Sequence, residues 1–177
     1  MPRLFTGLEI PSDTALPLSR QRGGLSGAHW IDPQNYHITL RFIGDVDMQI
    51  AREVTDALRS IPTPQNIATR ITHLDFFGGK KPRSLYTGLE PNSDIANLYA
   101  AQERIFQRIS LPPDSRKFTP HVTLARLRGT RPSDLAKFMS NSMWFAPLVF
   151  NVHHFTLYSS RNSKGGGPYI VEKTYDF

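Results

Sequence analysis

YHITLRF at residues 36–42 and HVTLAR at residues 121–126 decide the fold. In the first, residues alternate, so that His37, Thr39 and Arg41 would share one face of a strand and the apolar residues the other. We therefore predict a half-buried strand at each copy of His-x-Thr-Leu. The copies lie 84 residues apart, a separation that suits one motif in each half of the chain.

Outward from these motifs, a similar order of elements recurs, which predicts an α+β fold built from two similar halves. Helices are expected over 46–61, capped by Asp45 or Asp47, after Asn92 or Ser93, and after Ser133. The stretch after Pro11 contains Pro17, Gly23 and Gly24, so any helix there is short. The other predicted strands cover 3–10, 66–77, 84–90, 148–159 and 168–176.

Length and composition indicate one domain over residues 1–177, made of two pseudo-symmetric lobes. The chain has no cysteine, which suits a reducing compartment, and its start resembles no signal peptide. We expect a cytoplasmic monomer that does not associate with membranes. Lys and Arg exceed Asp and Glu by 21 to 15, and a charge of +6 makes an anionic partner plausible.

The repeated motif predicts acid–base chemistry on phosphate. Of two imidazoles with pKa values near 6.5, one can stay neutral as a base while the other is protonated as an acid. The hydroxyls of Thr39 and Thr123 can donate to phosphate oxygens. One such motif alone is more often an ordinary strand, but two copies on polar faces favour a site at His37 and His121.

The sequence resembles the 2H phosphoesterase family, and within it the bacterial and archaeal RNA 2',3'-cyclic phosphodiesterases, formerly described as 2'-5' RNA ligases. The resemblance is carried, in order, by RLFTGLEIP, HWIDPQNYHITLRFIGD, KFTPHVTLARLR and VHHFTLYSSRNSKGGGPYIVEKTYDF. It implies a duplicated two-lobe α+β fold in which antiparallel sheets line a central cleft, with helices packed outside.

The resemblance also implies a reaction and roles for this chain's residues. The enzyme would hydrolyse a 2',3'-cyclic phosphate at an RNA or nucleotide end to a 2'-phosphate, without metal or other cofactor. His121 would accept a proton from water and His37 would donate one to the departing 3'-oxygen. Reversible joining of RNA ends by a 2'-5' linkage belongs to the same family. The alternatives are a phosphodiesterase for a small cyclic phosphate, such as ADP-ribose 1'',2''-cyclic phosphate, and a noncatalytic nucleotide- or RNA-binding relative.

Two arginines are candidate phosphate ligands. Strand alternation places Arg41 on the face of His37, but places Arg126 on the face opposite His121, so a bulge or the strand end would have to turn Arg126. The family pattern favours Arg126. Phe5 and Tyr158 are substrate-binding candidates that could stack on a base, as are Trp30 and Phe76.

Further charged residues have weaker interpretations. The histidines at 29, 73, 153 and 154 are expected to be structural, because adjacent strand residues such as His153 and His154 point to opposite faces and ligate one metal poorly. Basic residues in loops could follow an RNA backbone or could simply be solvated. They are Lys80, Lys81, Arg83, Arg126, Arg128, Arg131, Arg161 and Lys164. The glycines at 165–167 are interpreted as a turn.

Overall fold

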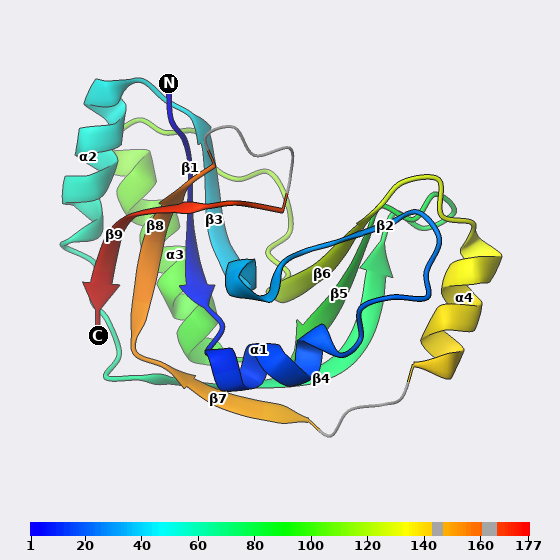
Figure 1. Ribbon diagram of the computed structural model, residues 1–177. Coiled ribbons are helices and arrows are strands. Elements are labelled where there is room, and N and C mark those ends of the chain that lie inside the picture. Colours follow the sequence, from blue (N-terminus) through cyan, green and yellow to red (C-terminus); the bar gives the residue numbers. More distant parts are fainter. Residues whose placement is uncertain (143–146, 161–165) are drawn as a thin grey trace.

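The computed structural model describes residues 1–142, 147–160 and 166–177 (Figure 1). The predicted Arg161 and Lys164, and the first glycine of 165–167, lie outside these residues. The strands are β1 (Arg3–Glu9), β2 (Ala28–Trp30), β3 (His37–Asp45), β4 (Ile67–Phe77), β5 (Ser84–Leu89), β6 (His121–Leu127), β7 (Leu148–Val152), β8 (His154–Ser159) and β9 (Ile170–Asp176). The helices are α1 (Ser12–Ser19), a 3-10 turn at Pro33–Asn35, α2 (Met48–Leu58), α3 (Ser93–Arg108) and α4 (Pro132–Asn141).

All nine strands belong to one antiparallel sheet in the order β7-β4-β5-β6-β3-β1-β8-β9, with β2 paired to β6. The predicted α+β class and antiparallel pairing are confirmed. The two motif strands, β3 and β6, are neighbours in the middle of the sheet, where Ile38 lies opposite Val122. On either side of this joint lie β1, β8 and β9 in one half and β5, β4 and β7 in the other, the arrangement expected of two lobes.

The helices begin where local chemistry starts them. Asp47 caps α2 by accepting from the amide of Ile50, and Asn92 caps α3 by accepting from the amides of Asp94 and Ile95. The predicted cap at Ser133 is wrong. Helix α4 begins one residue earlier at Pro132, whose ring sets φ for a first helical turn, and it has no side-chain cap.

Two apolar clusters hold the helices to the sheet. The larger one lies under α2 and α3 and includes Leu8, Ile38, Val54 and Phe106, all at most 1% exposed. The smaller one packs Leu135 of α4 against the β5 and β6 side chains Leu85, Ala125 and Leu127. In Figure 1, α2 and α3 accordingly lie at one end of the sheet and α4 at the other. The motif strands lie between them.

Candidate functional site

The register between β3 and β6 brings the two motifs together. Since Ile38 lies opposite Val122 in an antiparallel pair, the positions flanking them meet on the other face, His37 beside Thr123 and Thr39 beside His121. Ile38 and Val122 are fully buried. The four predicted side chains therefore share the face opposite the core, as the alternation predicted.

Both imidazoles are held in the same orientation by the backbone two residues earlier. His37 Nδ1 is 2.8 Å from the carbonyl oxygen of Asn35, and His121 Nδ1 is 2.6 Å from that of Thr119. Because a carbonyl only accepts, each Nδ1 carries the proton and each Nε2 is the nitrogen left to face the site. Thr39 Oγ1 lies 3.0 Å from His37 Nε2 and donates to it while His37 is neutral.

Aromatic side chains enclose each histidine. Phe5 and Tyr169 lie 5.0 and 5.1 Å from the ring of His37, and Tyr158 lies 5.9 Å away. Phe5 and Tyr158 are only 4% and 8% exposed and stack on each other. They thus pack against the imidazole and offer little free face to a base, which corrects the role predicted for them.

The second histidine has its own aromatic neighbours, which the sequence reasoning missed. Phe77 and Tyr86 lie 4.9 and 5.0 Å from the ring of His121. A signal was available: LFTGLE at residues 4–9 recurs as LYTGLE at residues 85–90, so Tyr86 is the counterpart of Phe5. The repeat also supports the duplication independently of the His-x-Thr motifs.

Burial of the rings lowers the pKa of both histidines. Desolvation, opposed by the Asn35 carbonyl and reinforced by the charges of His121 and Arg126, lowers the pKa of His37 from 6.5 to about 4. Desolvation and Arg126 also lower the pKa of His121, against the Thr119 carbonyl. Near pH 7 both rings of the free protein are therefore neutral, with Nε2 able to accept a proton.

A bulge turns Arg126 toward the site. Tyr86 lies opposite Thr123 but Leu85 lies opposite Ala125, so Leu124 is an extra residue without a partner. The residues beyond it change faces, and Arg126 joins the face of His121, as the family pattern required. Arg126 is exposed, and within the described ranges no carboxylate pairs with it.

A matching bulge turns Arg41 away. Gly7 lies opposite Thr39 and Thr6 opposite Arg41, so Leu40 is the extra residue and Arg41 leaves the face of His37. Its guanidinium is buried, pairs with Glu103 of α3, and donates to the Pro112 carbonyl 2.5 Å away. The prediction that Arg41 binds substrate is wrong, because strand alternation does not continue through a bulge.

Arg41 instead anchors the loop that leads into the second motif. Besides Pro112, this loop is held at Asp114, whose amide donates to the other carboxylate oxygen of Glu103, and at Phe118, whose ring stacks on Tyr99 at 4.1 Å. The same loop carries Thr119, whose carbonyl orients His121. Arg41 is thus a positioning residue for His121.

The remaining candidates lie around the site or away from it. His73 packs over Gly88, the residue opposite His121, and His29 lies opposite Arg126 on β2. Trp30 packs against Phe138 of α4 and Phe76 against the smaller cluster, so neither offers a stacking surface near the histidines.

Side chains suited to metal binding are sparse. His154 lies 3.5 Å from Glu9. Over the described ranges, no three His, Asp or Glu side chains gather closely enough to hold a metal ion. No helix in those ranges is long and apolar enough to cross a membrane.

Comparison with known proteins identifies the family. The model of the 2'-5' RNA ligase superfamily matches residues 15–164. A Thermotoga maritima protein named RNA 2',3'-cyclic phosphodiesterase is 30% identical over 149 residues, covering 82% of this chain and 77% of the relative. Proteins of the same name from Aeropyrum pernix and Aquifex aeolicus are 33% and 35% identical over 57% and 56% of this chain, and the matches span 58% and 55% of those relatives.

Solved structures show the same fold. A Thermus thermophilus protein superposes with a TM-score of 0.78 at 19% identity, covering 98% of this chain and 97% of that one. Escherichia coli LigT complexed with 3'-AMP superposes with a TM-score of 0.77 at 20% identity, covering 99% and 98%.

Proposed function

The chain belongs to the 2'-5' RNA ligase superfamily, and from this premise we propose that it is an RNA 2',3'-cyclic phosphodiesterase that leaves a 2'-phosphate. The observation that carries the proposal is the pairing of Ile38 with Val122, which sets two His-Thr pairs side by side with each Nε2 facing one space. The names of the Thermotoga, Aeropyrum and Aquifex relatives support the same reaction.

The reaction opens one ester bond of the ring. Water attacks phosphorus as His121 Nε2 takes its proton, the bond between phosphorus and O3' breaks, and protonated His37 gives its Nε2 proton to O3'. The product carries a 2'-phosphate and a 3'-hydroxyl, and exchange with solvent returns the two protons. If a 5'-hydroxyl replaced water, the same bond changes would join RNA ends through a 2'-5' linkage.

Three further side chains are placed to hold the phosphate. Thr39 and Thr123 lie on the face of the histidines, and each hydroxyl can donate to a nonbridging oxygen. Arg126, exposed and without a carboxylate partner among the described residues, can neutralise the charge that the phosphate carries through the transition state. We assign no metal to this reaction, since acid, base and cationic ligand are all supplied by side chains.

The test is product analysis on an RNA with a 2',3'-cyclic end. Purified, EDTA-treated protein should convert the end to a 2'-phosphate, whereas a 3'-phosphate, an unchanged end or a loss of activity on chelation would contradict the proposal. Turnover of ADP-ribose 1'',2''-cyclic phosphate in preference to the RNA would favour the small-substrate alternative. Tight RNA binding without any turnover would favour a noncatalytic relative.

Substitution of the histidines tests the assignment of acid and base. His37→Ala and His121→Ala should each lower kcat at least ~100-fold, the usual worth of one general acid or base. The matched control is His153→Ala, an exposed histidine between β7 and β8, which should leave kcat unchanged. Circular dichroism would show whether each variant keeps its fold, and a folded variant of either motif histidine at full rate would refute the mechanism.

A further inference from the structure

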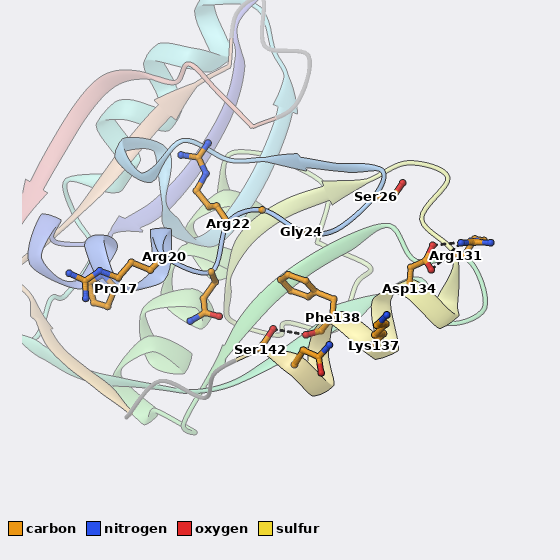
Figure 2. A pocket seen from close by; sticks show the side chains of 13 residues that line it. Pro17, Arg20, Arg22, Gly24, Ser26, Arg131, Asp134, Lys137, Phe138 and Ser142 are labelled. Carbon is orange, nitrogen blue, oxygen red and sulfur yellow. Dashed lines mark hydrogen bonds and ion pairs between the residues drawn. The ribbon is translucent and has the colours of Figure 1, made fainter.

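A basic groove lies on the α4 side of the molecule. It encloses about 980 Å³ between residues 17–26 and α4. Figure 2 shows side chains from both walls around it, including Arg20 and Arg22 on one side and Arg131 and Lys137 on the other. Neither motif histidine lines it. A volume of this size, lined by four cations, would hold an extended anionic ligand better than a single small ion.

Two of the four cations are unpaired among the described residues. Arg131 binds Asp134 at 2.8 Å, and Arg22 lies 3.5 Å from Asp32. No carboxylate in the described ranges lies within salt-bridge distance of Arg20 or Lys137. The groove therefore keeps a positive charge of about two that its own walls do not neutralise, which is the electrostatic signature of a phosphate-binding surface.

The groove also has apolar surface beside this charge. Phe138 of α4 and Pro17 of α1 line it, and Figure 2 shows the Phe138 ring between the two walls. Phe138 is half-buried and its other neighbour is Trp30, with ring centroids 5.9 Å apart. Alternation of cations with an accessible aromatic ring is the pattern by which single-stranded nucleic acid is bound, through phosphates and stacked bases.

A basic segment of chain connects the groove to the site. Arg126 lies on the face of His121, Arg128 follows at the strand end, and Arg131 lines the groove. The segment is fixed to the groove wall, because the Arg128 amide donates to Gly27 at 2.9 Å and the Thr130 hydroxyl to Ser26 at 2.8 Å. Even fully extended, the five residue steps from Arg126 to Arg131 span at most about 17 Å.

We infer that this groove binds the sugar-phosphate backbone of single-stranded RNA, a few nucleotides to the 5' side of the cyclic end that occupies the histidine site. The inference rests on the proposed function and narrows its substrate class to oligonucleotides. A mononucleotide or a small cyclic phosphate held between His37 and His121 cannot reach Arg20 or Lys137, so only a longer RNA gains from them.

The experiment uses a length series of RNAs with 2',3'-cyclic ends, from a mononucleotide to a decamer, and the double variant Arg20→Gln/Lys137→Gln. Both residues are exposed, so the fold should be kept. Wild-type kcat/KM should rise with length and then level off. For the decamer the variant should lose about tenfold, the combined effect of two exposed phosphate contacts, while its mononucleotide kcat/KM stays at the wild-type value.

Salt dependence and a matched control make the result specific. Binding of a decamer with a plain 3'-hydroxyl, measured by fluorescence anisotropy, needs no catalysis, and its log Kd against log salt slope should fall by about 1.4 in the variant. Arg104→Gln/Arg108→Gln, which removes two exposed cations from α3, should change neither measurement.

Equal behaviour of the groove variant and wild type on the decamer would overturn the inference. So would a loss of length dependence in Lys80→Gln/Lys81→Gln alone, since the RNA would then follow the β4–β5 turn. A protein that binds the decamer through Arg20 and Lys137 but turns over no cyclic end would support the groove and refute the proposed function, so the two failures are distinguishable.

Discussion

The two lowered histidine pKa values predict a specific pH dependence of catalysis. With its pKa at about 4, His37 is protonated in only about one free molecule in a thousand at pH 7. Lowering the pKa from 6.5 to about 4 corresponds to about 3 kcal/mol against the protonated ring. The proposed acid is therefore nearly absent until substrate binds.

The bound phosphate can supply this energy. A negative charge about 4 Å from a protonated imidazole is worth about 4 kcal/mol at an effective dielectric constant of ~20. This slightly exceeds the desolvation penalty, so the pKa of His37 should return to near its ordinary value in the complex. The phosphate should in the same way raise the pKa of His121, and the two rings titrate as a pair.

The assay is the pH profile of kcat/KM and of kcat between pH 4 and 9. The profile of kcat/KM reports the free protein, in which both pKa values lie below 6.5, so it should fall about tenfold per pH unit above about pH 6.5. The profile of kcat reports the complex, and its fall should begin at higher pH. Arg126→Gln removes a charge that lowers both pKa values, so the fall in kcat/KM should begin at higher pH.

The reasoning would be refuted by a kcat/KM that stays level from pH 7 to pH 9, because no protonated histidine would then be needed from the free protein. A profile of kcat that falls at the same pH as kcat/KM would show that the phosphate does not raise the pKa values.

Three substitutions test other parts of the site. Arg41→Met should lower the free energy of unfolding by about 3 kcal/mol, since it leaves Glu103 buried without its partner, and Glu103→Gln in the same chain should restore part of the loss in urea titrations. Gly7→Ala should lower kcat more than stability, because the new Cβ would lie 3.3 Å from the His37 ring and 3.0 Å from a backbone oxygen; an unchanged kcat would mean that the ring moves freely. Thr123→Val keeps the shape but removes a donor to phosphate, so kcat/KM should fall about tenfold or more with thermal stability nearly unchanged.

The strands and the histidines could be predicted because they depend on local pattern. Alternation in YHITLRF fixes which residues share a face for as long as the strand is regular, and it correctly placed His37 with Thr39. Helix caps are equally local, and Asp47 and Asn92 were both among the predicted residues. The short strand β2 was missed because three residues, Ala28–Trp30, carry no periodicity and owe their conformation to β6.

The roles of the two arginines could not be predicted from one strand at a time. A bulge is set by the register between two strands, and in both motifs it falls at the leucine that follows His-x-Thr. Its effect is to reverse the face of everything beyond that leucine. Reading Arg41 and Arg126 by alternation therefore gave each of them the wrong face.

The equivalent bulges show how a near-symmetric pair of motifs gives an asymmetric site. In the first half Arg41 comes directly after the bulged leucine and is buried. In the second, Ala125 takes that position and Arg126 comes one place later, on the site face. Exchanging the order of an arginine and its neighbour thus decides between an anchor for a loop and a ligand for phosphate.

The same asymmetry accounts for distinct acid and base roles. Arg126 lowers the pKa of both histidines, so its charge does not by itself determine which ring is the acid. Burial does, because Phe5, Tyr158 and Tyr169 crowd His37, whereas His121 has two aromatic neighbours and is more open to solvent. The more buried imidazole is the stronger acid once the phosphate has protonated it, and it gives its proton to O3' more readily. The more open imidazole meets water, the nucleophile that the base must deprotonate. Aromatic packing, more than the motifs themselves, therefore favours His37 as the donor and His121 as the acceptor.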